Sequence, residues 1–242
     1  MLSEYFNRIA SSYDQAIQEI DRLKLFPYAG YEEMMDRIAK EIMAQLHLNE
    51  YKILDIGIGT GQLYQKIKPE LLKLTGVDFS KNMLEIAKLR LPSSTFFLHD
   101  FVQGLPKEIQ DEKFDFIVST FCMHHLDIDK YVDMIHYLLN YLTPFGKIYI
   151  GDILFLDEES KKRCYKSSSD IWDESEYYHV FNQLLQKVNS QLKLSFMKIS
   201  FCVGIIIIEN YHECTLQFEE NLVEYSQNTM KWKSSQARKK RE

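Results

Sequence analysis

Glycine is scarce in this chain and is concentrated at one point. Three of the nine glycines, Gly57, Gly59 and Gly61, fall within five positions. They lie between residues 51–56, which predict a short buried strand, and a segment from Leu63 that predicts a helix. A turn from strand to helix needs residues that tolerate positive φ, and glycine also lets a ligand approach bare backbone. The cluster therefore predicts a ligand-binding turn in an α/β fold, as adenosine-bearing cofactors use.

The spacing of these glycines argues against a dinucleotide. A Gly-x-Gly-x-x-Gly fingerprint needs its third glycine at position 62, which is Gln62. The pattern Asp-x-Gly-x-Gly-x-Gly that begins at Asp55 instead resembles the first motif of class I S-adenosylmethionine-dependent methyltransferases. The resemblance implies that Asp55, Gly57, Gly59 and Gly61 bind the amino acid end and ribose of S-adenosylmethionine. The alternative is that the glycines only form a tight turn.

Further predicted strands end in polar residues, at positions that lie beside the cofactor in the same fold. Residues 72–78 predict a strand that ends at Asp78, about twenty residues after the first glycine, where a carboxylate can accept hydrogen bonds from ribose. A helix-capping role for Asp78 is the alternative. The resemblance adds Phe79 to the cofactor site, assigns Asp100 and Phe101 to the adenine, and adds Ser119 from the predicted strand 114–120.

Predicted strands alternate with predicted helices along most of the chain. This alternation indicates a parallel sheet covered by helices on both faces, because parallel neighbours need crossover connections. We expect a three-layer, Rossmann-like α/β fold of seven strands, mostly parallel with an antiparallel last strand. Strand five should follow a Pro-Gly turn at 142–146, and the apolar run 201–208 should form a buried strand. The expected domain spans 1–210, and the tail 211–242 has no assigned function.

Two regions outside the central strands should form the substrate side. The opening Phe-x-x-x-Ala-x-x-Tyr-Asp, which ends in Tyr13 and Asp14, resembles a segment that folds over the cofactor in small-molecule methyltransferases. It belongs to an expected N-terminal helical cap, residues 1–50. Residues 155–190 should form a lid inserted after strand five, in which Trp172, Tyr177 and Tyr178 either contact substrate or pack in the core.

Two histidines, His124 and His125, follow the predicted fourth strand. Ligands bind at the carboxyl ends of the strands in such sheets, so either imidazole is a candidate general base, with a pKa of about 6.5 if it is unperturbed. The segment also resembles one in methyltransferases whose first histidine often has a structural or cofactor-side role, which is the alternative for His124. Methyl transfer from a sulfonium is an in-line displacement, so alignment and exclusion of water alone could also suffice. Because no Asn/Asp-Pro-Pro-Tyr motif and no Pro-Cys nucleophile follows this strand, a small molecule is the favoured acceptor. Cys122 should be a buried apolar residue.

The composition of the chain argues against several classes of binding partner. The net charge of −6 argues against a broad nucleic-acid-binding surface. The four cysteines show no paired metal-ligand spacing, so no metal is expected, and neither a signal peptide nor a membrane-spanning segment is evident. A cytoplasmic monomer or homodimer is the expectation.

Three functions remain open at the level of sequence. The first is methyl transfer from S-adenosylmethionine to a small-molecule acceptor. The second is a sensor or assembly protein that binds the cofactor without transferring its methyl group, since transfer needs no signature residue. The third is methylation of RNA recruited by the basic residues between Lys231 and Glu242.

Overall fold

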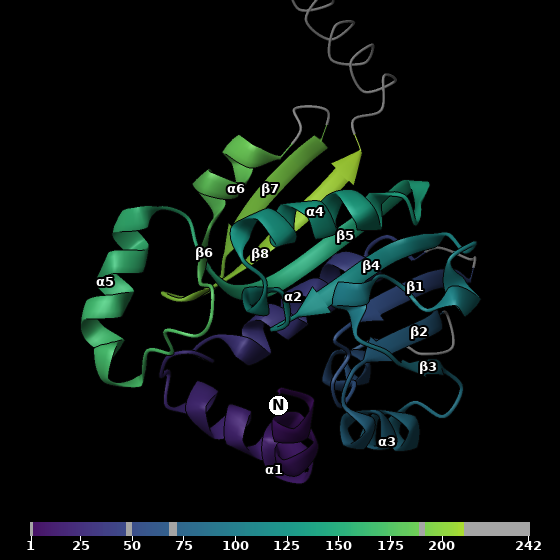
Figure 1. Cartoon of the computed structure of the whole chain (residues 1–242), viewed down its shortest axis with the longest axis horizontal. Helices are drawn as coiled ribbons and strands as arrows, with labels where there is room; N and C mark the ends of the chain where they lie inside the picture. Colours follow the sequence, from purple (N-terminus) through teal and green to yellow (C-terminus); the bar gives the residue numbers. More distant parts are fainter. Residues whose placement is uncertain (1, 47–49, 68–71, 189–191, 211–242) are drawn as a thin grey trace, which may run out of the picture. The chain divides into compact units, whose positions relative to one another are not determined.

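A computed structural model describes residues 2–46, 50–67, 72–188 and 192–210 of the chain, shown in Figure 1. The predicted tail 211–242 lies outside these residues, and the following concerns the compact unit Met1–Glu209. The α-helices are α1 (Leu2–Arg22), α2 (Tyr31–Met43), α3 (Lys81–Arg90), α4 (Ile128–Leu139), α5 (Glu158–Ser168) and α6 (Phe181–Lys187). The strands are β1 (Tyr51–Ile56), β2 (Leu72–Asp78), β3 (Thr95–Leu98), β4 (Phe114–Thr120), β5 (Leu142–Phe155), β6 (His179–Val180), β7 (Leu192–Lys198) and β8 (Val203–Asn210). Short 3₁₀ helices are η1 (Gln62–Gln65), η3 (Phe101–Gln103), η4 (Lys107–Ile109), η5 (Met123–His125) and η6 (Ser169–Ile171).

The strands form one mixed sheet in the order β3-β2-β1-β4-β5-β8-β7. The pairs β2–β3, β1–β2, β1–β4 and β4–β5 are parallel, whereas β8 runs antiparallel to β5. This confirms the predicted Rossmann-like class with its antiparallel last strand. The expected seven strands omit the two-residue β6, which pairs with the end of β5. Among the described residues, no helix is both long and apolar enough to cross a membrane.

Alternating side chains divide the core into two layers, one on each face of the sheet. Ile53 packs in one hydrophobic cluster and Leu54, the next residue of β1, packs in the other. The first cluster includes Met34, Ile38 and Ile42 of α2, and the second includes apolar residues of α4 and α6. Successive side chains of a strand point to opposite faces, so helices on both sides give the three layers of Figure 1.

Two local predictions were wrong. The helix expected from Leu63 is the single 3₁₀ turn η1 among the described residues, with Gly61 in the left-handed region at its start. The turn expected at 142–146 belongs to β5, because Leu142 already pairs with Phe114. The register then jumps to Phe116 opposite Lys147, so Pro and Gly lie within an irregularity of the strand.

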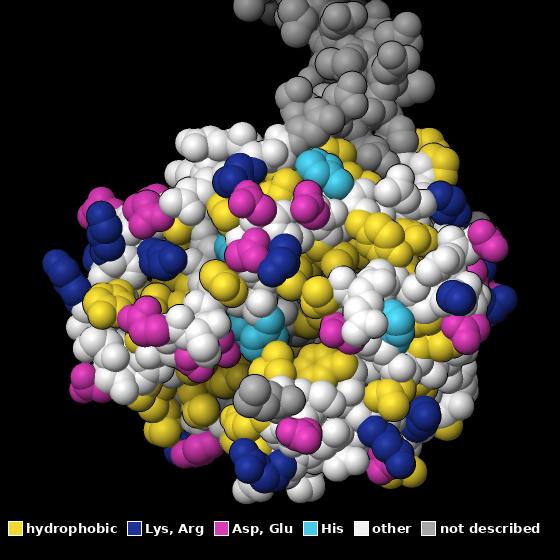
Figure 2. Space-filling model, viewed as in Figure 1, with side chains coloured by type: hydrophobic (Ala, Val, Ile, Leu, Met, Phe, Trp, Pro, Cys, Tyr) yellow, Lys and Arg dark blue, Asp and Glu magenta, His cyan; other side chains and the backbone are white. Residues whose placement is uncertain are grey.

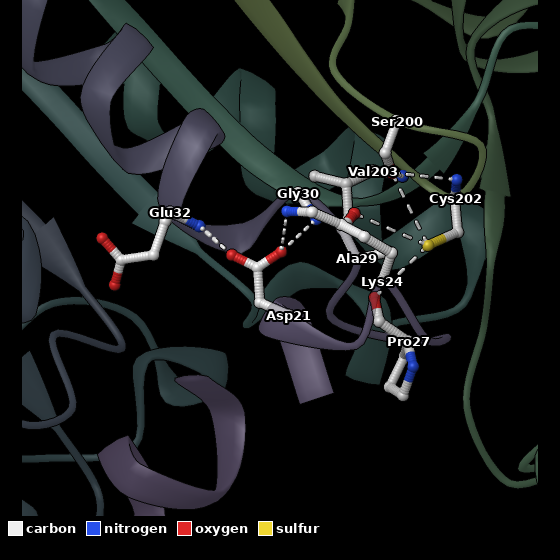
Figure 3. A network of polar contacts seen from close by, with 9 residues as sticks. All are labelled: Asp21, Lys24, Pro27, Ala29, Gly30, Glu32, Ser200, Cys202 and Val203. Carbon is white, nitrogen blue, oxygen red and sulfur yellow. Dashed lines mark hydrogen bonds and ion pairs between the residues drawn. The ribbon is translucent and has the colours of Figure 1, made fainter. Parts of the chain in front are cut away.

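A buried carboxylate joins the two N-terminal helices to each other, as Figure 3 shows. Asp21, near the end of α1, accepts hydrogen bonds from the backbone N–H of Gly30 (2.7 Å) and Glu32 (2.9 Å), where α2 begins. Gly30 has a φ of 94° and would place a Cβ 3.0 Å from Cβ of Ser200, in the turn between β7 and β8. Asp21 thus supplies the cap that glycine lacks, while glycine permits the close approach to the turn.

Replacing Asp21 by alanine should lower the free energy of unfolding by about 1 to 3 kcal/mol, because two buried backbone donors lose their acceptor. Burial by itself raises the pKa of Asp21, but hydrogen bonds from Glu32, Gly30 and Lys24 outweigh it and lower the pKa overall. The stabilisation is therefore present above about pH 4, the ordinary range of an unfolded aspartate, and is lost as pH falls through the lowered value. Denaturant unfolding at pH 7 and pH 3 measures both effects. Asp133→Ala, at an exposed position of α4, is the control, and an equal loss in both variants would contradict the assignment.

Candidate active site

A cleft of about 630 Å³ opens at the edge of the sheet where the parallel strands end. Parallel strands bring their carboxyl ends to one edge, so residues distant in sequence meet there. Predicted residues that line the cleft are Tyr13, Asp55, Gly57, Gly59, Asp78, Phe79 and His125. Lining residues that the sequence reading did not single out include Phe6, Tyr31, Met35, Thr120 and Phe121. For Phe6 the signal was present, because it begins the aromatic motif that ends in Tyr13.

The three glycines of the turn serve different purposes. A Cβ on Gly57 would lie 2.3 Å from Sγ of Cys122, so this glycine allows the loop after β4 to pack on the turn. A Cβ on Gly61 would lie 2.8 Å from Leu91, just beyond α3. A Cβ on Gly59 would meet no heavy atom within 4 Å, so this bare backbone faces the cleft. Only Gly59 keeps space open for a ligand.

Two buried aspartates place carboxyl oxygens in the cleft. Asp78 accepts hydrogen bonds from the backbone N–H of Gly59 (2.8 Å) and Ser80 (2.7 Å), and burial raises its pKa to about 6. Burial also raises the pKa of Asp55 to about 8, although the nearby Tyr64 hydroxyl partly opposes this. Oδ1 of Asp55 is buried without a hydrogen-bond partner of good geometry. A buried carboxyl oxygen without a partner fits a cleft that receives a ligand with cationic or hydrogen-bonding groups.

Helix α1 lies along the glycine turn and α3. Asn7 accepts hydrogen bonds from the Ser80 hydroxyl (2.9 Å) and the Asn82 backbone N–H (3.0 Å). Asp14, next to Tyr13, accepts from the Thr60 hydroxyl (2.7 Å) and pairs with Arg90 (2.5 Å). These polar contacts attach the N-terminal helix to the elements that form the cofactor turn.

The aromatic side chains of α1 reach the interior of the cleft. The ring of Phe6 packs edge-on against Phe79, Tyr13 and His125, with centroids 5.7 to 6.1 Å apart. Residues from α1, from the end of β2 and from η5 therefore form one apolar wall.

Four predicted cofactor residues do not line this cleft: Gly61, which packs against Leu91, and Asp100, Phe101 and Ser119. Asp100 and Phe101 line an adjoining cavity of about 990 Å³ with Leu98 and His99, and Phe79 and His125 contribute to both cavities. Asp100 also caps η3 by accepting a hydrogen bond from the backbone N–H of Val102 (3.1 Å). Ser119 is buried with an unpartnered hydroxyl, whereas its neighbour Thr120 lines the cleft. Since neighbouring residues of a strand alternate between faces, only one of the two can face the ligand.

The two histidines lie in different environments, although they are neighbours in η5. Oδ1 of Asp152 lies 2.6 Å from Nδ1 of His124, and Oδ2 accepts a hydrogen bond from the His124 backbone N–H (3.0 Å). Burial opposes charge on His124, but the attraction and hydrogen bond of Asp152 prevail and raise its pKa. His125 lines the cleft, where burial and then repulsion by His124 lower its pKa to about 4. The pKa of about 6.5 expected for an unperturbed histidine therefore does not apply to His125, because its burial lowers the pKa and the sequence does not reveal that burial.

The lid aromatics do not line the cleft. Trp172 stacks on Phe26 with ring centroids 5.0 Å apart and contacts Tyr178 edge-on at 4.4 Å. Trp172, Tyr177 and Tyr178 line another cavity, of about 1050 Å³, together with Glu176. The sequence reading had not singled out Glu176, which lies in a loop without a motif. Oε1 of Glu176 lies 3.6 Å from Nε2 of His124, so the lid and the histidine pair are in contact.

Similarities to known proteins agree with this geometry. Residues 53–146 match the family described as a methyltransferase domain. An uncharacterized methyltransferase from Alkaliphilus oremlandii is 29% identical over 75% of this chain and 84% of its own length. Another from Bacillus cytotoxicus is 30% identical over 64% and 68%, respectively.

Solved structures of cofactor complexes share the fold. A complex titled DhpI-SAM-HEP has a TM-score of 0.61 at 16% identity and covers 85% of this chain and 94% of its own. Magnesium protoporphyrin IX methyltransferase from Synechocystis, with bound SAH, has a TM-score of 0.56 at 16% identity, covering 75% and 84%. The chain belongs to the class I S-adenosylmethionine-dependent methyltransferases. Its cofactor is S-adenosylmethionine, as the glycine motif predicted.

Replacing Asp78 by alanine should weaken binding of S-adenosylhomocysteine by about ten- to a hundredfold. A hydrogen bond to a charged group contributes about 1.5 to 3 kcal/mol, which corresponds to that range in dissociation constant. The variant should also be less stable, because the backbone N–H groups of Gly59 and Ser80 lose their acceptor. Calorimetric titration, with thermal unfolding beside it, measures both effects. Asp111→Ala, at an exposed position, is the control, and unchanged affinity in Asp78→Ala would leave Asp78 with a capping role only.

Proposed function

We propose that this methyltransferase acts on a small-molecule acceptor through the cleft at the strand ends. The observation that carries the proposal is the aromatic lining of the cleft. Phe6 and Tyr13 of α1 line the cleft. Tyr31 at the start of α2 and Phe121 directly after β4 line it as well. Such a lining suits a small apolar or aromatic body with few polar groups, as in most small-molecule sites.

Methyl transfer requires of the protein mainly that it align the reactants and exclude water. S-adenosylmethionine, when bound, supplies an activated methyl group on a positively charged sulfur. Gly59 leaves room at the turn, while Asp55 and Asp78 offer carboxylate oxygens to the polar and cationic parts of the cofactor. The aromatic wall excludes water, which favours displacement by the acceptor over hydrolysis.

The histidine pair, in this proposal, forms the acceptor end of the cleft. His125 faces the cavity, and His124 behind it is oriented by Asp152 and contacts Glu176 of the lid. Trp172, Tyr177 and Tyr178 then border the approach of the acceptor rather than the cofactor. A protein that only senses the cofactor would have no use for two imidazoles at this end of the cleft.

Surface charge supports a small molecule over a nucleic acid. On the face in Figure 2, Lys and Arg side chains are scattered among acidic ones, and hydrophobic side chains gather around the middle. Binding to RNA would call for a basic patch or stripe, and the chain carries a net charge of −6.

Incubation with S-adenosylmethionine labelled in its methyl group tests the proposal. The acceptor source is a cell extract filtered to remove protein and nucleic acid. We expect label in a small organic product only when the enzyme and the extract are both present. A parallel incubation uses the protein and nucleic acid that the filter retains, and label in that fraction with none in the filtrate would overturn the small-molecule assignment.

Replacing His125 by alanine should lower turnover by about a hundredfold or more in that assay, while affinity for S-adenosylhomocysteine stays within a few fold. A group that acts on the acceptor in the transition state affects kcat far more than cofactor binding. His136→Ala, on α4 and away from the cleft, is the matched control. Parallel loss of turnover and cofactor affinity would instead assign His125 to packing against the cofactor.

A further inference from the structure

We propose that His124, His125 and Glu176 bind a divalent cation of the zinc type at the acceptor end of the cleft. Their potential donor atoms, two imidazole nitrogens and one carboxylate oxygen, all lie within 4.8 Å of one another. Nε2 of His124 is 3.6 Å from Oε1 of Glu176. Ligand atoms at neighbouring corners of a zinc tetrahedron are about 3.3 Å apart, given bonds of about 2.0 to 2.1 Å. Small side-chain rotations would therefore bring the three donors to bonding distance.

Neighbouring residues already hold His124 and Glu176 by hydrogen bonds, as they hold metal ligands in other proteins. Asp152 occupies Nδ1 of His124 at 2.6 Å, which leaves Nε2 as the free donor. A carboxylate on the far nitrogen of a metal-binding histidine fixes the ring and increases its basicity. The Tyr178 hydroxyl donates to Oε2 of Glu176 at 2.8 Å and leaves Oε1 for the cation.

The backbone also connects the lid to the histidines. The backbone N–H of Tyr177 donates to the carbonyl oxygen of His124 at 2.8 Å. This bond keeps the loop that carries Glu176 beside η5. The geometry of the three donors thus depends on contacts within the folded chain and not on one flexible side chain.

The position of the cluster suits a cation that binds substrate. His125 lines the cofactor cleft, and Glu176 lines the neighbouring cavity beside Trp172 and Tyr177. Three protein ligands leave the fourth position of a tetrahedral site open, as in catalytic zinc centres with two histidines and a glutamate. The carboxylates of Glu176 and Asp152 would balance the two charges of the cation.

The ligand set favours zinc over the harder cations. Imidazole suits zinc and its first-row neighbours, whereas magnesium and calcium prefer oxygen ligands. Zinc is also redox-inert, and methyl transfer requires no change of oxidation state.

The inference deepens the proposed function, on which it rests, by naming the class of acceptor. A hydroxyl or thiol group that occupies the open position loses its proton to solvent at lower pH than it does free in water. The anion then attacks the methyl carbon, and the sulfonium sulfur keeps the electron pair of the broken bond. The cation, rather than a histidine base, would activate the acceptor.

Zinc binding to the purified full chain tests the site without acceptor or cofactor. The protein is first stripped with a chelator and then titrated with Zn²⁺ in competition with a chromophoric chelator. We expect one zinc ion per chain in the wild type. His125→Ala and Glu176→Gln should each lose at least about a hundredfold in affinity, and Asp152→Asn about ten- to a hundredfold. Glu159→Gln, whose side chain on α5 is 82% exposed, should match the wild type.

Each outcome decides the question. Loss of zinc in the two ligand variants, with wild-type affinity in Glu159→Gln, supports the site. Absence of zinc from the wild type, or equal binding by all variants, overturns it and assigns any bound zinc to adventitious surface positions. Thermal unfolding identifies a variant that fails to fold, and the other ligand variant then decides. Titration with S-adenosylhomocysteine is separate: if it does not bind, the proposed function fails, whatever the zinc result.

Discussion

The parallel order of β2, β1, β4 and β5 is the constraint on which the site depends. Each parallel strand must end at the same edge of the sheet, so each contributes a polar residue there: Asp78, Asp55, Thr120 and Asp152. Asp78 and Asp55 face the cofactor cleft, while Asp152 lies beneath the histidine pair. In the proposed function, the order of the strands in the sheet is also an order of roles, with the cofactor at β2 and β1 and the proposed acceptor end at β4 and β5.

The loop after β4 shows how tightly the two halves of the site are coupled. Phe121 has a φ of 49°, which is strained for a residue with a large side chain. Its backbone N–H donates to the carbonyl oxygen of Gly151 at 2.9 Å, and the next residue, Cys122, lies against the backbone of Gly57. The cofactor turn and the histidines therefore share one packed contact.

The sequence could predict those features whose signals lie within a few neighbouring residues. The glycine turn and Asp78 were recognisable, because a tight turn and a strand end each leave their mark within a few residues. The approach of Glu176 to His124 was not, since it depends on how the insertion after β5 folds back over about fifty residues of chain. The lowered pKa of His125 was equally hidden, because desolvation is set by Phe6 and other residues from distant elements. For the fold, the mostly parallel sheet with an antiparallel last strand was accessible, but the path of β5 through its Pro-Gly irregularity depended on pairing with Phe114.

The buried pair of Asp152 and His124 explains why the acceptor side can be both dry and polar. An isolated carboxylate at this depth would be costly, yet the pKa of Asp152 is lowered, because His124 and the backbone N–H of Ile153 outweigh the effect of burial. The same pairing fixes the His124 ring with Nε2 directed toward Glu176. Removing only one partner would leave a buried group unsatisfied, so the two residues must be retained or replaced together. The pairing thus gives Nε2 of His124 a fixed direction, and the proposed cation site depends on that direction because Glu176 lies 3.6 Å away.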